Sequence, residues 1–331
     1  MTGMLPPFGW GPLLDDWKFV PGWTVFALAL LVGYLALHTA ARRRGGTPVP
    51  PWRFGCFVTG LVLLVATVSS AIDSYAMAAF WVHMVEHLML IMVVPAFLVA
   101  GHPLTVLRAG VRPEHRARVD AVLQSGPVAV LTHPAVGMLA YAAVIIATHL
   151  TSFMDQMVLH PWLMPTEQAL YVAAGWLMLV TLIGDEPIRW HLPYLMRFVL
   201  VLVGMVPDAV VGIVLMQTTK VPYPLMFAHH PGWAPAPLRD LAVGGGLMWV
   251  VGDGLMMCYG VALIVALAAG KTARNQMVGP WLESVRRQTL VDNVAASGDT
   301  EGYTGVDVDE DDAALAAYNR MLARLNGQGE A

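Results

Sequence analysis

Two histidines stand one helical turn apart in an apolar stretch of the chain. His83 and His87 lie in the segment HMVEHLML, and a spacing of four residues puts both imidazoles on one face of a helix. Two imidazoles in this arrangement can bind one metal ion, and imidazole suits zinc, copper, iron and nickel. Ionisable side chains inside a membrane helix are costly and mark functional sites by default. The spacing therefore indicates a metal or proton site, with a hydrogen-bonded pair that joins helices as the alternative.

Methionine adds a possible soft ligand to this pair. The chain contains 20 methionines in 331 residues, and Met84 lies directly beside His83. Thioether sulfur favours Cu(I), so imidazole combined with methionine fits copper better than a hard cation. Most of the other methionines are expected to be packing residues, because Met fills gaps in apolar bundles. Met84 is therefore the candidate auxiliary ligand.

Carboxylates inside or at the ends of apolar stretches are the next candidates. Asp253 lies near the middle of the last stretch, Asp240 opens it, and Asp208 lies near the middle of the stretch before. Asp240 and Asp253 are expected to belong to the metal site, where they orient ligands or relay protons; bonding to a neighbouring helix is the alternative for Asp208 and Asp253. His149 and His160 flank the outer end of the fourth stretch and the loop after it, and both are additional candidates that nothing in the sequence requires.

The same residues permit a different chemistry. His83, Glu86 and His87 match H-x-x-E-H, in which two histidines bind zinc and the glutamate acts as a base. Catalytic zinc normally takes a third protein ligand. The sequence offers Asp208 or Asp253 for this position but marks neither of them. An intramembrane zinc metalloprotease is therefore an alternative hypothesis.

The composition places these residues in a membrane. Hydrophobic residues make up 57% of the chain and charged residues 13%, whereas soluble domains carry about 25% charged residues. Several apolar stretches reach about 20 residues, enough to cross the hydrocarbon core as a helix. We expect an all-α fold, a polytopic membrane helical bundle of about seven transmembrane helices, with spans at 22–40, 54–72, 76–100, 128–149, 166–184, 194–218 and 241–269.

Basic residues gather in alternate loops between these spans. Arginine clusters follow the first and third spans, and Lys271, Arg274, Arg286 and Arg287 follow the last. Under the positive-inside rule these loops face the cytoplasm and the N-terminus lies outside. His83 then lies about 10 Å from the outer surface, from a rise of about 1.5 Å per residue. The arginine clusters indicate topology and not nucleic-acid binding, and membrane lipid is an expected partner of the spans.

The chain becomes more polar from about residue 271. Residues 297–312 contain several glycines and end in an acidic run, which is typical of a flexible linker. Leu315, Tyr318, Leu322 and Leu325 then recur at helical spacing. We expect a transmembrane domain at 1–270 and a cytoplasmic tail at 271–331, with an acidic linker and a short amphipathic helix.

Six segments taken in order resemble the integral-membrane CtaG family of cytochrome c oxidase assembly factors. They are HMVEHLML, AGHPL at 100–104, THP at 132–134, LIGDEP at 182–187, GIVLM at 212–216 and RDLAVGGGLMWVVGD at 239–253. The resemblance implies a non-enzymatic factor of a bacterial plasma membrane that assists copper insertion into a haem–copper oxidase. His83 and His87 look like the family's histidine pair, and Asp240 looks like the acidic residue that opens its last span.

The chain departs from this family in several places. Relatives tend to carry further histidines at the start of the fifth span and in the middle of the sixth, where this chain reads PWLMPTEQALYVAAG and MVPDAVVG, and many carry Glu in place of Asp253. Met and carboxylate ligands such as Met164 and Glu167 replace those histidines, or the chain keeps a scaffold without metal. The leading hypothesis is Cu(I) at His83 and His87, with cytochrome c oxidase subunits as partners. A metal-free assembly scaffold is a further alternative, and the oligomeric state stays open.

Overall fold

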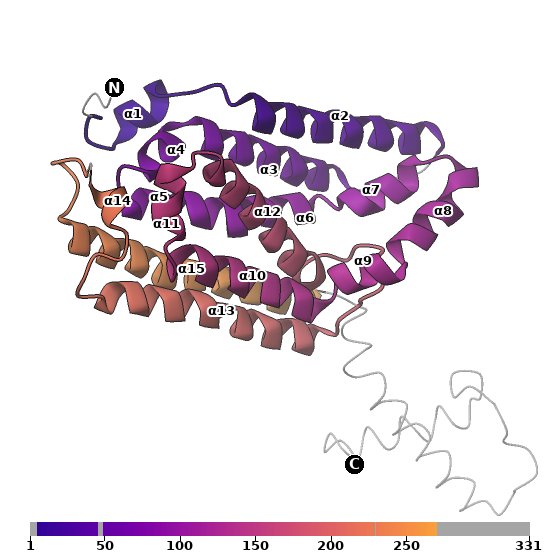
Figure 1. Cartoon of the computed structure of the whole chain (residues 1–331). Helices are drawn as coiled ribbons and strands as arrows, with labels where there is room; N and C mark the ends of the chain where they lie inside the picture. Colours follow the sequence, from indigo (N-terminus) through magenta and orange to yellow (C-terminus); the bar gives the residue numbers. More distant parts are fainter. Residues whose placement is uncertain (1–4, 46–48, 229, 270–331) are drawn as a thin grey trace, which may run out of the picture. The chain divides into compact units, whose positions relative to one another are not determined.

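The computed structural model describes residues 5–45, 49–228 and 230–269, and within these ranges the regular elements are all helices (Figure 1). The all-α membrane bundle expected from the sequence is therefore confirmed. Residues up to Leu263 form one compact unit. The tail predicted at 271–331, with its acidic linker and amphipathic helix, lies outside the described residues.

Long helices make up most of this unit. They are α2 (Pro21–Arg43), α3 (Pro51–Ser69), α10 (Pro134–His149), α12 (Leu163–Leu182), α13 (Tyr194–Gln217) and α15 (Pro237–Ala269). One further long segment is composite: α5 (Phe80–Leu88) continues through the π-helical turn η1 (Met89–Val93) into α6 (Val94–Ala100).

Short helices lie at both ends of the bundle (Figure 1). One end has α1 (Trp10–Asp15), α4 (Ala71–Ala76), α11 (Phe153–Leu159) and α14 (Pro224–Phe227). The other end has α7 (Pro103–Gly110), α8 (Pro113–Leu123) and α9 (Gly126–Leu131). The arginine-rich loop after the third predicted span belongs to the second end, which the positive-inside rule predicts to face the cytoplasm.

Five of the described helical segments are long and apolar enough to cross a membrane, or six if the bent pair α10 and α11 is one span. The chain is therefore a multi-pass membrane protein. The helix α12 is 20 residues long, but it is not among these segments. Its mean hydropathy is lower because Glu167 and Gln168 lie near its start. The count of seven and the outside N-terminus stay predictions.

Proline decides where several helices begin. Pro lacks a backbone N–H and its fixed φ suits the first helical turn, where α2, α3 and α10 carry it. Proline also interrupts the span predicted at 128–149. His133, directly before Pro134, has extended backbone (φ −66°, ψ 132°), since a residue that precedes proline avoids the α region. The stretch is consequently divided into α9 and α10.

The helix α12 packs against α10, α6 and η1. The contact with η1 is tight at Gly175, where an added Cβ would lie 1.9 Å from the carbonyl oxygen of Ile91. Pro95 follows four residues later and has no N–H to donate to that carbonyl. The π turn, the proline and the glycine thus form one tight contact directly after the segment that carries His83 and His87.

We expect Gly175→Ala to destabilise the protein, because the new methyl group meets backbone that a rotamer change cannot move. Overpacking of this kind costs about 1–3 kcal/mol, or more when backbone must shift. Thermal unfolding in detergent measures the effect. Gly33→Ala in α2 is the matched control, since nothing lies within 4 Å of an added Cβ there. Equal stability of the two variants would contradict the contact.

Candidate metal centre

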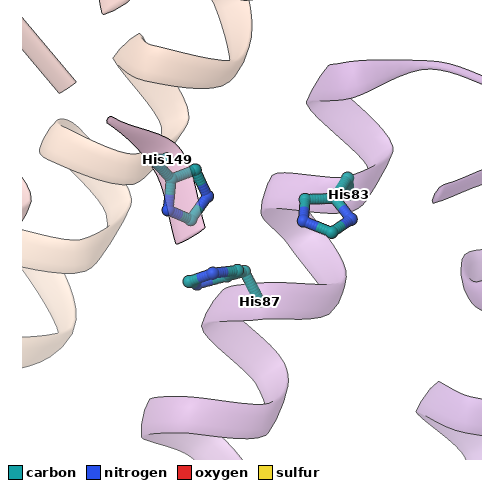
Figure 2. A group of neighbouring side chains, drawn as sticks. All are labelled: His83, His87 and His149. Carbon is teal, nitrogen blue, oxygen red and sulfur yellow. The ribbon is translucent and has the colours of Figure 1, made fainter. Parts of the chain in front are cut away.

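The helices α5 and α10 bring three imidazoles together. His83 and His87 come from α5, His149 is the last residue of α10, and their exposed fractions are 2%, 2% and 1%. One ring nitrogen from each lies within 4.8 Å of the other two. Figure 2 shows the His149 ring facing His87 from the neighbouring segment, and their ring centroids are 4.5 Å apart. These three residues form the metal-capable group of the described chain.

The ring nitrogens of this group are largely free of hydrogen bonds. His149 Nδ1 lies 2.9 Å from the carbonyl oxygen of Ile145, which assigns the proton to Nδ1 and the lone pair to Nε2. Among the described residues, His149 Nε2, His87 Nε2 and both ring nitrogens of His83 have no hydrogen-bond partner. A buried polar group left unpaired costs about 1–3 kcal/mol. Free imidazole lone pairs gathered in one place are the donors that a transition metal requires.

The helix α12 adds a buried carboxylate beside the imidazoles. Glu167 is 2% exposed, and its Oε2 lies 3.7 Å from His83 Nε2. Its Oε1 accepts a hydrogen bond of 2.8 Å from the Tyr171 hydroxyl. That hydroxyl also lies 2.8 Å from Thr148 Oγ1, which is 2.9 Å from His149 Nδ1. A chain of hydrogen bonds therefore links the carboxylate to the third imidazole.

The other acidic residue of the H-x-x-E-H segment is engaged elsewhere. Glu86 is buried, and its Oε1 accepts a hydrogen bond of 2.7 Å from the side-chain amide of Gln168. The same amide nitrogen donates to Asp73 at 2.8 Å, and Asp73 pairs with Lys18 at 2.6 Å. Glu86 thus belongs to a polar chain that ends at the partly exposed Lys18, and it lies outside the metal-capable group.

Short segments cover the imidazoles at this end of the bundle. Tyr223 donates a hydrogen bond to the carbonyl oxygen of His149, and its ring stacks on Phe80 with centroids 5.9 Å apart. Burial, followed by the negative charge of Asp155, raises the pKa of Tyr223 above its usual range, so the hydroxyl remains a neutral donor. Asp155 of α11 accepts hydrogen bonds from the first backbone N–H groups of α14, which holds the two short helices together.

Asp240 positions the helix that carries the two histidines. It is fully buried, and its carboxylate accepts hydrogen bonds from the backbone N–H groups of Phe80 at 2.8 Å and Trp81 at 3.0 Å. It also lies 3.1 Å from His230 Nε2. A carboxylate at a helix N-terminus pairs with amides that have no partner inside the helix. Asp240 lies outside the metal-capable group, and its contacts fit the expectation that it orients ligands.

The structure joins neither Asp253 nor Met84 to the three imidazoles. Asp253 lies in α15, and its Oδ1 is buried without a hydrogen-bond partner in the described chain. Asp208 accepts a hydrogen bond of 2.6 Å from Tyr141, so it connects α13 to α10. Met84 is fully buried, and its Cγ lies against Gly244 of α15. The roles of Asp253 and Met84 as ligands stay predictions.

Comparison with known proteins identifies the family. Residues 32–269 match the family described as cytochrome c oxidase caa3 assembly factor (Caa3_CtaG). The chain belongs to this family. The resemblance seen in the ordered sequence segments is therefore confirmed.

The curated relatives are mycobacterial proteins. An uncharacterized protein of Mycobacterium leprae is 29% identical over 318 residues, which cover 94% of this chain and 44% of the relative. Uncharacterized proteins of Mycobacterium bovis and Mycobacterium tuberculosis are each 30% identical over 322 residues, which cover 95% of this chain and 45% of each relative. The chain thus spans less than half the length of these relatives. No solved structure matches the chain.

Removal of the Asp240 carboxylate is expected to loosen α5. Asp240→Ala leaves the buried N–H groups of Phe80 and Trp81 without their acceptor, and each unpaired buried donor costs about 1–3 kcal/mol. Thermal unfolding in detergent should show a clearly lower midpoint. Asp120→Ala serves as the control, because its partner Arg108 is half exposed and exposed ion pairs contribute little. An unchanged midpoint for Asp240→Ala would rule out this anchoring role.

Proposed function

We propose that this chain binds copper at His83, His87 and His149 and assists its insertion into a haem–copper cytochrome c oxidase. One observation carries the proposal: three buried imidazoles present ring nitrogens within 4.8 Å of one another, most of them without any hydrogen bond. The family name supports a role in oxidase assembly. The copper is then the cargo of the protein and not a catalytic cofactor, which agrees with a non-enzymatic function.

The three imidazoles suit both Cu(I) and Cu²⁺ as ligands. Metal–nitrogen bonds of about 2.0–2.1 Å place two ligating nitrogens of one metal roughly 3.3–3.6 Å apart. The three nitrogens lie within 4.8 Å of one another, which allows separations wider than this. Rotation of the imidazole rings about their side-chain bonds would bring the three nitrogens onto one ion. The fixed Nδ1 proton of His149 leaves Nε2 as the ligand atom, as second-shell hydrogen bonds commonly do at metal sites.

The position of the site suits exchange at the membrane surface. His83 and His87 lie in α5, which follows α4, and His149 ends α10, which precedes α11; Figure 1 shows α4, α11 and α14 at one end of the bundle. The loop arginines predict that the opposite end faces the cytoplasm. Copper would then be taken up and passed on from the outer side. The partners proposed for this step are the oxidase subunits that receive copper.

The protease alternative gains no support from the site. A base in H-x-x-E-H chemistry must face a metal-bound water, whereas Glu86 is bonded to Gln168 and joined to Asp73 through it. The metal-free scaffold remains the competing hypothesis. It predicts normal oxidase assembly when the imidazoles are removed.

Copper binding is expected to depend on the cluster histidines. The purified parent should hold Cu(I) against a chromophoric chelator, and His83→Ala combined with His87→Ala should lose stoichiometric copper. His149→Ala should weaken binding as well, because it removes the third donor. The control is His160→Ala, since His160 is exposed at the end of α11. Copper retention by the double variant equal to that of the parent would refute the site.

Oxidase assembly in cells separates a copper site from a scaffold. A strain lacking the gene should lose cytochrome c oxidase absorbance and activity, and the parent gene should restore both. The double variant His83→Ala, His87→Ala should accumulate in the membrane but fail to restore activity. Full restoration by the variant would favour the metal-free scaffold.

A further inference from the structure

We propose that Glu167 is a fourth ligand of this centre, used for divalent ions of the zinc and cupric class and not for Cu(I). The inference rests on the proposed function, because it presupposes that the three imidazoles hold a metal. It starts from one contact: Oε2 of Glu167 lies 3.7 Å from Nε2 of His83, between two side chains that are each 2% exposed.

The length of this contact distinguishes between two interpretations. A charge-assisted hydrogen bond would bring nitrogen and oxygen to about 2.7–2.9 Å. Two ligands on one tetrahedral ion, each about 2.0–2.2 Å from it, stand roughly 3.3–3.6 Å apart. The observed 3.7 Å is too long for the hydrogen bond and close to the separation across an ion shared with His83. Glu167 lies outside the group whose ligand atoms are all within 4.8 Å of one another, so ligation together with all three imidazoles requires its side chain to rotate toward the ion.

The burial of the carboxylate points to a cation. An ionised carboxylate removed from water requires a charged partner or several hydrogen bonds. In the described part of the chain, the ion pairs give Glu167 no lysine or arginine, and its charge partner is His83. A divalent ion among the imidazoles would supply the missing positive charge.

The surroundings of Glu167 hold it ready for this role. Tyr171 donates to Oε1, so Oε2 is the oxygen left on the His83 side. The same hydroxyl contacts Thr148, which in turn contacts His149. One tyrosine therefore connects the fourth ligand to the second shell of the third imidazole, as expected of a preorganised metal site.

Ligand chemistry explains why Glu167 should discriminate between ions. Carboxylate oxygen suits harder cations, whereas soft sulfur ligands select Cu(I). Zinc takes four ligands in a tetrahedron, and Cu²⁺ prefers four nitrogen and oxygen donors. Cu(I) would be held by the three imidazoles alone, and Zn²⁺ or Cu²⁺ by the imidazoles together with Glu167.

Glu167→Gln tests this assignment, because the amide keeps the shape and the acceptor for Tyr171 but loses the anionic ligand. The affinities of the full chain for Zn²⁺ and for Cu(I) are measured by competition with chromophoric chelators, and Cu²⁺-loaded protein is examined by electron paramagnetic resonance. Zn²⁺ binding should weaken by about 100-fold or more, since loss of an outer-shell partner alone costs about 10–100-fold. Cu(I) affinity should stay the same, and the Cu²⁺ hyperfine coupling should change.

Glu86→Gln is the matched control, because it removes a second buried carboxylate from the same region that is bonded to Gln168 instead. It should leave the Cu²⁺ spectrum unchanged and affect Zn²⁺ far less than Glu167→Gln. Tyr171→Phe, which frees Oε1, should weaken Zn²⁺ by about tenfold while sparing Cu(I).

The possible failures can be told apart. Equal losses of Zn²⁺ affinity in Glu167→Gln and Glu86→Gln would show an effect of charge alone and overturn ligation by Glu167. An unchanged Zn²⁺ affinity and Cu²⁺ spectrum in Glu167→Gln would do the same, while Cu(I) binding that still requires the histidines leaves the proposed function standing. Copper retained without His83 and His87 would instead remove the proposed function itself.

Discussion

Polar groups buried away from both water and lipid are tolerated only when something else satisfies them. Four imidazole nitrogens in this chain, on His83, His87 and His149, are buried without a partner in the described structure. Each such group costs about 1–3 kcal/mol, and helix packing alone recovers none of that cost. A metal ion bound through one nitrogen of each ring would satisfy three of the four directly, because each neutral imidazole has a single lone pair.

The helix that carries two of the three imidazoles is fixed at both ends. At its start, the buried carboxylate of Asp240 accepts the first N–H groups of α5 and ties them to α15. At its end, η1 and Pro95 meet α12 at Gly175, where no side chain fits. π turns inside α-helices frequently occur at functional sites. Between these two fixed points, the direction of His83 and His87 is set by backbone contacts and not by side-chain packing alone.

Local sequence patterns predict part of this site and cannot predict the rest. The pair His83 and His87 follows from helical spacing, and the composition alone was enough for an all-helical membrane fold. His149 is different, because its place beside His87 arises from the packing of separate helices and leaves no periodic trace. The interruption before Pro134 did have a local cause, since a residue before proline avoids the α region. The stretch 128–149 is mostly apolar, so hydropathy alone predicts one continuous span there.

Glu167 shows how the site and the fold constrain each other. Together with Gln168 it lowers the hydropathy of α12, which is not among the described helices apolar enough to cross a membrane alone. In the bundle both residues are buried, to 2% and 5% exposure, and their side-chain contacts include His83 and Glu86 of α5 and Asp73 of α4. Hydrogen bonds to Tyr171, Glu86 and Asp73 then give their polar atoms partners. The polar residues that lower the hydropathy of α12 thereby favour these neighbours, because they supply the hydrogen-bond partners that lipid cannot. A polar segment near the start of α12 is thus compatible with the membrane in the assembled bundle, where Glu167 lies beside His83.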